Sequence, residues 1–472
     1  MDFVLEGHGH EHAVQTIVQV FYPNEGYKRL EAVPEKGKCV VSWYRDGTFG
    51  ADVFENGAQI ISCRGDRPRS PEYYGDKKIM TQGVAAAIFQ ALVEVTGYRP
   101  PWGTLTGVRP AKLLTEGRGV EYLKTEYLVN DDKIKLCEEV SVAEIEYINS
   151  SNVDDVGVYI GVPFCLSRCG YCSFTSFPLE KHGKYREAYF AALCKEIKFL
   201  GDILCGRRVT AVYVGGGTPT ALETGMLSEL LRLIRECFHG EYEFTVEGGQ
   251  PSSLKATRLQ ALADYGVNRL AINPQSLNNE TLANIGRNHT AEEFINVFNM
   301  AREMGFDNIN CDLIIGLPGE TPDDTAFTFT ELEKLSPESI TVHILAMKRA
   351  ADFNHSYGRY GKNELDTGRI EKMLDISGES CRRMGMQPYY MYRQKNMVGN
   401  FENVGYVKPG YQSIYNHMTM TEARSIFAAG AGAVTKLINH EKNLITRAFN
   451  VKNLYEYIER VDEMIERKKK LL

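Results

Sequence analysis

Three cysteines with the spacing C-x3-C-x2-C are the residues of this sequence with the clearest chemical potential. They are Cys165, Cys169 and Cys172. Three closely spaced thiolates can bind three irons of a four-iron cluster and leave the fourth iron without a protein ligand. Such an iron is suited to binding a small molecule. A structural zinc site is the alternative, but zinc prefers four ligands and the next histidine along the chain is His182.

A glycine-rich turn and a carboxylate follow two of the predicted strands. The turn is Gly215-Gly-Gly-Thr-Pro-Thr220, and Glu247 ends the next strand. Consecutive glycines allow close approach of the backbone to a ligand and can present amide groups to a carboxylate. A strand-terminal carboxylate can accept hydrogen bonds from ribose hydroxyls. An ordinary tight turn and a solvated surface glutamate are the alternatives.

Gln275 and Asp312 end the following two strands, and Asp312 lies in the otherwise apolar segment 310–319. A buried carboxylate is costly unless it has a partner. We therefore expect Asp312 to face a ligand or to pair with a base, for which Arg287 is a candidate. His289 could act as a catalytic base, but a role in ordering its own loop is the favoured interpretation.

The central part of the chain alternates between strand-like and helix-like patterns. Six strands are expected, with helices between them, which predicts a parallel sheet curled into a partial barrel. Parallel barrels carry their chemistry on the loops at the carboxyl ends of the strands, so we expect the motifs above to share one site. The expected strands are 156–160, 211–214, 243–247, 269–273, 310–315 and 340–345, and the clearest helices are 185–200, 227–237 and 294–304.

Two further regions flank this predicted barrel. Residues 1–152 mix strand-like and helix-like segments and are expected to form an α+β domain, with residues 153–380 as the barrel. Residues 381–472 are expected to be mainly helical and to act as a substrate lid. The α/β fold class predicted is therefore a partial (β/α)6 barrel between these two regions. The N-terminal elements expected are strands 39–44 and 48–53, joined by an Asp46-Gly47 turn, and helices 85–95 and 131–148.

Composition limits the class of protein. The net charge of −7 argues against a general nucleic-acid binder, which would be basic. The sequence opens without a secretory signal and has no run of about 18 apolar residues, so we expect a cytoplasmic protein without a membrane span. In that reducing compartment the eleven cysteines would be free or metal-bound.

The motifs resemble those of known families. The cysteine spacing and the Gly-Gly-Gly-Thr-Pro turn resemble the radical S-adenosylmethionine (SAM) superfamily. At closer range the chain resembles the oxygen-independent coproporphyrinogen III oxidase family, and its flanks resemble the HemZ branch, the coproporphyrinogen dehydrogenase-like proteins. The family resemblance rests on residues 159–165, 215–220, 287–290 and 312–318, and the branch resemblance on residues 101–110 and 392–400.

The resemblance implies a reaction and its cofactors. One [4Fe-4S] cluster and two SAM molecules would bind, and a radical derived from SAM would take hydrogen from a propionate side chain. Loss of carbon dioxide and one electron would leave a vinyl group. Two such oxidations convert coproporphyrinogen III to protoporphyrinogen IX in anaerobic haem (porphyrin) biosynthesis. The implied partners are this tetrapyrrole substrate and an electron donor such as flavodoxin or ferredoxin.

The resemblance also implies site residues. The cluster would be held by Cys165, Cys169 and Cys172. The substrate's propionates need cations, and we expect Arg393 and Lys395, which follow the aromatic run 389–392, to bind them. The first SAM would be served by Tyr159, Gly216 and Glu247, and the second by Gly217, Thr218, Gln275, Arg287, Asp312 and Ala346. Tyr171 is also expected to bind a cofactor.

One position departs from the family pattern. The oxidase proper has a fourth cysteine two residues after the third, whereas this chain has Phe174 there. A phenylalanine at this position is typical of the haem-chaperone branch, which binds haem and does not make it. A haem-binding chaperone of the same family, and a radical SAM enzyme acting on another tetrapyrrole, therefore remain alternatives.

Overall fold

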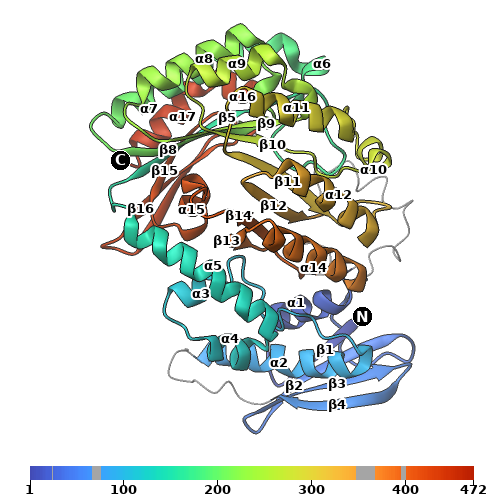
Figure 1. Cartoon of the computed structure of the whole chain (residues 1–472). Helices are drawn as coiled ribbons and strands as arrows, with labels where there is room; N and C mark the ends of the chain where they lie inside the picture. Colours follow the sequence, from blue (N-terminus) through green and yellow to red (C-terminus); the bar gives the residue numbers. More distant parts are fainter. Residues whose placement is uncertain (24, 66–75, 347–366, 395–399) are drawn as a thin grey trace. The chain divides into compact units, whose positions relative to one another are not determined.

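The computed structural model describes the whole chain of 472 residues except 24, 66–75, 347–366 and 395–399 (Figure 1). The chain divides into two compact units. Unit 1 comprises Met1–Ser141 and Tyr392–Glu402, and unit 2 comprises Val142–Met391 and Asn403–Leu472. The predicted domains 1–152, 153–380 and 381–472 stay a prediction, because compact units need not coincide with domains that fold alone.

Unit 1 is built on a four-stranded sheet of order β1-β2-β3-β4. β1 runs parallel to β2, and the other pairs are antiparallel. The predicted Asp46-Gly47 turn joins β2 to β3, and both residues have positive φ, 50° and 79°, as expected for a hairpin turn that matches the strand twist. The strands are β1 (Asp2–Glu6), β2 (Lys38–Arg45), β3 (Thr48–Glu55) and β4 (Ala58–Gly65).

Helix α2 (Asp76–Thr96) packs in the core of unit 1 beside α1 (Glu11–Phe21). Among the described residues its segment Lys77–Thr96 is long and apolar enough to cross a membrane, and half of that window is buried inside the protein. Ile88, Phe89 and Leu92 are fully buried against the sheet, so the apolar character of α2 is that of a core helix. The other helices that begin in unit 1 are α3 (Lys112–Thr115), α4 (Val120–Tyr127) and α5 (Asp131–Ser150).

Unit 2 contains an eleven-stranded sheet of order β13-β14-β12-β11-β10-β9-β8-β5-β15-β16-β17. The six predicted strands are consecutive in it and all run parallel. The sheet is open rather than closed, which confirms the predicted partial barrel. These strands are β5 (Val156–Val162), β8 (Val209–Gly216), β9 (Glu243–Gly249), β10 (Arg269–Ile272), β11 (Ile309–Ile315) and β12 (Ser339–Ile344).

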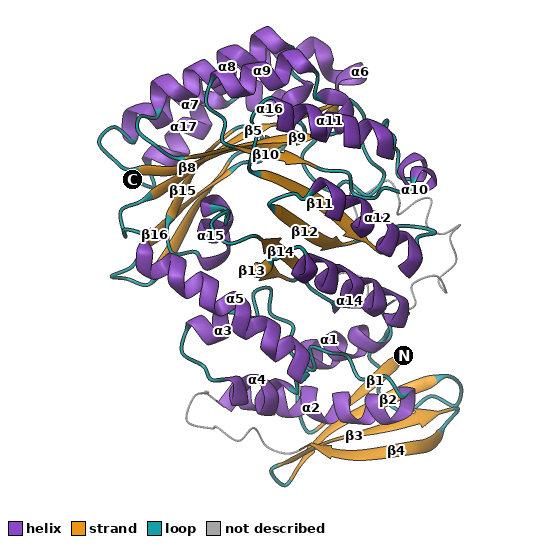
Figure 2. Cartoon of the chain, viewed as in Figure 1, coloured by secondary structure: helices purple, strands orange, loops and turns teal. Residues whose placement is uncertain are grey.

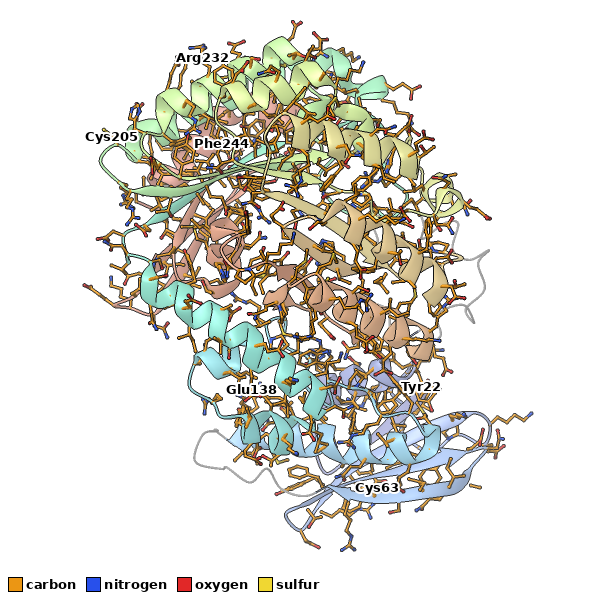
Figure 3. All side chains as sticks on the ribbon, viewed as in Figure 1. Tyr22, Cys63, Glu138, Cys205, Arg232 and Phe244 are labelled. Carbon is orange, nitrogen blue, oxygen red and sulfur yellow. The ribbon has the colours of Figure 1, made fainter. Side chains whose placement is uncertain are left out.

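Amphipathic helices connect these strands and lie beside the sheet in Figure 2. On α8 the apolar residues Leu227, Leu230 and Ile234 are buried, whereas Arg232 points away from the sheet (Figure 3). Such a stripe stabilises a helix through tertiary packing. The connecting helices are α7 (Arg186–Ile203), α8 (Thr224–Cys237), α9 (Ala256–Asp264), α10 (Asn279–Asn284), α11 (Ala291–Glu303), α12 (Pro322–Leu335) and α14 (Thr367–Arg383).

The C-terminal region adds to both edges of the same sheet. The strand β15 pairs in parallel with β5, and β14 pairs antiparallel with β12. Helices occur here as predicted. The strands after β13 were not predicted, because each is only five or six residues long. The elements are β13 (Gln387–Tyr392), β14 (Asn403–Val407), α15 (Ile414–Thr421), β15 (Ser425–Ala429), β16 (Val434–Asn439), β17 (Leu444–Phe449), α16 (Leu454–Glu459) and α17 (Val461–Lys469).

Candidate functional site

The three cysteines lie on a loop that follows β5, which lies between β8 and β15 in the sheet. The loop is closed at its base by two short parallel strands, β6 (Phe164–Cys165) and β7 (Phe177–Pro178). Cys165 and Cys169 are buried, and Cys172 is half-buried. The amide of Cys172 donates to the Cys169 carbonyl at 3.0 Å. The sequence motif is therefore presented by a compact, anchored loop.

The glycine turn after β8 packs directly against this cysteine loop. The amide of Gly217 donates to the Val162 carbonyl at 2.8 Å, and that of Thr218 donates to the Phe164 carbonyl at 2.7 Å. A Cβ atom added at Gly217 would lie 2.7 Å from the Phe164 carbonyl oxygen and 3.0 Å from Cys165 Sγ. There is no room for a side chain at position 217, so the requirement for glycine is steric.

The thiols suit a cluster better than a single ion. Burial raises the pKa of the Cys165 thiol to about 12, and the Thr218 hydroxyl partly offsets this. In the part of the chain that the structure describes, no group of three His, Cys, Asp or Glu side chains converges on one metal ion. A four-iron cluster has a different requirement, since each cysteine binds a separate iron. The residues present therefore fit a cluster held by three thiolates.

Three stacked tyrosines lie beside Glu247. Tyr159 on β5 and Tyr213 on β8 have ring centroids 6.2 Å apart, and Tyr415 from α15 stacks on Tyr213 at 4.5 Å. The Tyr213 hydroxyl donates to Glu247 Oε1 at 2.5 Å. Burial raises the pKa of Glu247 to about 7, the hydroxyl of Tyr213 lowers it, and the charge of Asp312 raises it further. The pKa of this carboxyl group is therefore close to neutral pH.

Asp312 is the second carboxylate of this group, half-buried and in the middle of β11, whereas the sequence predicted it at the strand end. Asn310 Nδ2 donates to its Oδ1 at 2.7 Å, and His343 Nε2 lies 3.8 Å from its Oδ2. Burial alone would raise the pKa of Asp312, but hydrogen bonds from His343, Asn310 and Thr341 outweigh it and lower the pKa. The pKa of Asp312 is thus lowered while that of Glu247 is raised, a separation that is typical of functional carboxylate pairs.

The prediction that Arg287 partners Asp312 is wrong. Arg287 donates instead to the Gly249 carbonyl at 3.4 Å and to the Tyr171 hydroxyl at 3.3 Å. The sequence placed the two residues near one sheet edge but could not show which way a long side chain reaches. Sequence reasoning missed His343, which is the residue beside Asp312. His343 lies in β12, the neighbouring parallel strand, where it pairs with Ile314 of β11.

Several buried polar groups near the strand ends have no hydrogen-bond partner among the described residues. They include Gln275 Oε1, Arg287 Nε and both ring nitrogens of His289, although the Pro274 carbonyl is close enough to raise the pKa of His289 slightly. Burial and the charge of Arg287 nevertheless lower that pKa to about 4. Gln275 also has a positive φ of 69°. Buried polar groups are normally satisfied, so this set suits a ligand that supplies the missing bonds.

The predicted SAM residues come from successive parallel strands and from the segments that follow them. The structure connects many of them, since Thr218 contacts Cys165 and Arg287 contacts Tyr171. Tyr159 lies in β5, Gly216 ends β8 with Gly217 and Thr218 following, Glu247 lies in β9, Gln275 follows β10, Asp312 lies in β11 and Ala346 follows β12. Their roles as ligands stay a prediction.

The predicted substrate residues belong to unit 1. Arg393 is buried, donates to the Leu105 carbonyl and, at 2.8 Å, to the Asn400 carbonyl, and stacks over the Trp102 ring. These contacts favour an anchoring role for Arg393, and its role in binding substrate stays a prediction. Lys395 lies outside the described residues.

Comparison with known proteins agrees with this site. Residues 159–332 match the Radical SAM superfamily. The chain is 38% identical to the oxygen-independent coproporphyrinogen-III oxidase-like protein HemZ of Bacillus subtilis. The alignment extends over 395 residues and covers 80% of this chain and 78% of that protein. The chain therefore belongs to the radical SAM family of HemZ-like proteins. This superfamily uses a [4Fe-4S] cluster and SAM.

Other relatives cover less of the chain. The oxygen-independent coproporphyrinogen III oxidase of Escherichia coli is 33% identical over 189 residues, 40% of this chain and 41% of that enzyme. The heme chaperone HemW of Bacillus subtilis is 29% identical over 65% of this chain and 76% of that protein. The solved structure of coproporphyrinogen III oxidase (HemN) from Escherichia coli has a TM-score of 0.54 at 24% identity, covering 69% of this chain and 73% of that one. That likeness shows a shared fold.

Proposed function

We propose that this protein is a radical SAM oxidoreductase that decarboxylates propionate side chains of coproporphyrinogen III oxidatively, giving the vinyl groups of protoporphyrinogen IX. The observation that carries the proposal is the likeness to HemZ across 80% of the chain, which includes the cysteine loop. The carboxylate pair and the unpartnered polar groups at the strand ends support a built ligand site there. We place the reaction in the cytoplasm, with flavodoxin or ferredoxin as the electron donor.

In this proposal Cys165, Cys169 and Cys172 hold the [4Fe-4S] cluster and leave one iron for SAM. The bound cofactors supply the radical chemistry that removes a hydrogen atom from the propionate, and the protein supplies position and shelter. Because Gly217 has no side chain, its backbone lies close to the Cys165 sulfur, where the cluster would bind. Burial of Cys165 and Cys169 limits the access of water to this site.

The two carboxylates have distinct tasks in binding. Glu247, with Tyr213 donating to one oxygen, keeps its other oxygen for ligand hydroxyl groups such as those of ribose. Asp312, held ionised by Asn310 and His343, offers a fixed negative charge for a cationic ligand. Arg287 offers the opposite charge for a carboxylate. A ligand with a ribose, an ammonium group and a carboxylate matches this set, and SAM carries all three.

An anaerobic turnover assay tests the proposal. Protein with reconstituted cluster is mixed with SAM, a strong reductant and coproporphyrinogen III, and mass spectrometry follows the loss of carbon dioxide from one and then two propionates. The matched control is the Cys169→Ala variant, which should form neither product nor 5′-deoxyadenosine. Substrate should increase the yield of 5′-deoxyadenosine from the wild-type protein. Cleavage of SAM without any change in coproporphyrinogen III would point to another tetrapyrrole as the substrate.

Haem binding is the second candidate function. It is favoured by the likeness to HemW and by Phe174, whose side chain is 72% exposed at the end of the cysteine loop. An exposed aromatic ring suits contact with a flat macrocycle. Tight, stoichiometric binding of haem by a protein that never consumes SAM under strong reductant would replace the oxidase proposal with this one.

A further inference from the structure

Each of the three site cysteines has a polar side chain within hydrogen-bond distance of its sulfur. Thr218 Oγ1 donates to Cys165 Sγ at 3.6 Å, and Gln250 Nε2 donates to Cys169 Sγ at 3.9 Å. The Ser176 hydroxyl lies 3.6 Å from Cys172 Sγ. Hydrogen bonds to sulfur are longer than those to oxygen, and these three distances are in their range. The donors come from three separate segments, so their coincidence on three thiols is a property of the folded chain.

Two of these donors are held in place by the same local device. Thr218 and Gln250 each precede a proline that opens a short 3-10 turn, Pro219–Ala221 after β8 and Pro251–Ser253 after β9. A residue before proline is restricted to extended conformations, and the φ/ψ values are −145°/95° for Thr218 and −90°/124° for Gln250. The Thr-Pro and Gln-Pro pairs therefore fix the backbone from which both side chains extend.

Burial makes these donors effective. Thr218, Gln250 and Ser176 are all buried, so water does not compete well for their hydrogen atoms. Gln250 Nε2 also donates to the carbonyl and hydroxyl of Ser167, at 3.2 and 3.1 Å, which fixes the amide beside the loop. A hydrogen bond in such a low-dielectric environment is electrostatically stronger than one in water.

We propose that Thr218, Gln250 and Ser176 tune the reduction potential of the cluster by donating one hydrogen bond to each of its three thiolates. One-electron reduction by an external donor makes the cluster more negative, and part of that charge lies on the cysteine sulfurs. Hydrogen bonds to those sulfurs stabilise the reduced form and raise the potential. The inference rests on the proposed cluster ligands but not on the identity of the substrate.

The test is a redox titration of the anaerobic holoprotein without SAM. Gln250→Leu and Thr218→Val keep the approximate side-chain volume and remove the donor, and Ser176→Ala removes the third. Each should lower the potential, with a shift of roughly three- to tenfold in the reduction equilibrium, where tenfold corresponds to 59 mV for one electron. Thr218→Ser keeps the hydroxyl and should keep the wild-type potential. Thr257→Val removes the hydroxyl that Thr224 contacts at 3.3 Å, away from every sulfur, and is the matched control.

Iron content and vibrational spectra separate this inference from the cluster assignment. Wild-type iron content with unchanged potentials in all three donor variants would overturn the tuning role while leaving the cluster ligands intact. Loss of iron only in the cysteine variants supports those ligands independently. If a donor variant fails to retain iron, resonance Raman of the wild-type protein decides. Exchange into D2O should shift the Fe–S(Cys) bands, and unshifted bands would exclude hydrogen bonds to the thiolates.

Discussion

Two regions of unit 2 bury charged and polar side chains in different surroundings. In the first, Glu196 on α7 is fully buried and accepts bonds from Lys468 Nζ at 2.5 Å, the Tyr457 hydroxyl at 2.5 Å, the Gly430 amide at 2.8 Å and Asn450 Nδ2 at 2.9 Å. In the second, at the strand ends, Gln275 Oε1, Arg287 Nε and the ring nitrogens of His289 have no such partners in the part of the chain that the structure describes. We call the first region the Glu196 network.

The difference distinguishes buried polar groups that stabilise the fold from those that are available to bind a ligand. A buried charge is stable when the protein itself provides its partners, and the Glu196 network does so with residues from the C-terminal helices. The Tyr189 hydroxyl beside it donates to the Gly161 carbonyl at 2.7 Å, at the base of the cysteine loop. The strand ends instead leave bonds unmade, a cost that a bound ligand can offset. The predictions below test this contrast.

Loss of a cluster cysteine should have the largest effect. Anaerobically purified protein should contain about four irons per chain, and Cys165→Ala, Cys169→Ala or Cys172→Ala should abolish iron retention and SAM cleavage. Iron analysis and 5′-deoxyadenosine release measure the two outcomes. The control is Cys205→Ala, at the surface of unit 2 (Figure 3), together with Cys194→Ala, Cys237→Ala and Cys381→Ala. A requirement for Cys311 in holding iron would contradict the three-ligand assignment.

Breaking the Glu196 network should have the next largest effect. Lys468→Met leaves Glu196 buried without its cation and should lower the free energy of unfolding by roughly 3–5 kcal/mol, as measured by urea denaturation under anaerobic conditions. The double variant Glu196→Gln/Lys468→Met removes both charges and should recover part of that loss. Lys469→Met, whose partner Glu466 is exposed, is the control. Equal stability of Lys468→Met and the wild type would show that the network is not structural.

The poised carboxyl of Glu247 should make stability depend on pH. Its folded pKa of about 7 exceeds the unfolded value of 4.5, so the folded protein binds more protons between these values. Stability from this group is fully present below pH 4.5 and is lost as the pH rises through 7, by about 3 kcal/mol at most. Glu247→Gln should remove this decline, as measured by unfolding at a series of pH values. Comparison with the wild type cancels the opposite trend from His289 and His417, whose pKa values are lowered to about 4. Identical pH profiles would contradict the assignment.

Removing an unpartnered group at the strand ends should barely change stability. Gln275→Leu should alter the free energy of unfolding by less than about 1 kcal/mol, because Oε1 has no bond to lose. SAM binding, measured by equilibrium dialysis, should weaken by roughly 1–3 kcal/mol if the amide contacts the ligand. Gln260→Leu, on the exposed face of α9, is the matched control. A large loss of stability with unchanged SAM binding would reverse the contrast between the two regions.

The amino-acid sequence by itself determined the local chemistry. The spacing of Cys165, Cys169 and Cys172 and the glycine turn before Thr218 were readable because both motifs lie within short, continuous segments. The six parallel strands were predictable for the same reason, since apolar runs of that length between amphipathic helices indicate buried parallel strands.

Tertiary structure alone decided which distant side chains meet. Tyr415 stacks on Tyr213, His343 rather than Arg287 accompanies Asp312, and Gln250 reaches Cys169. No spacing in the sequence predicts these pairs, because each depends on strand order and on the direction of a side chain across a sheet edge. The same holds for β15, which pairs with β5 from the far end of the chain. Local sequence patterns determine which helices and strands form and roughly where they end. Tertiary packing determines which side chains become partners and therefore which pKa values are raised or lowered.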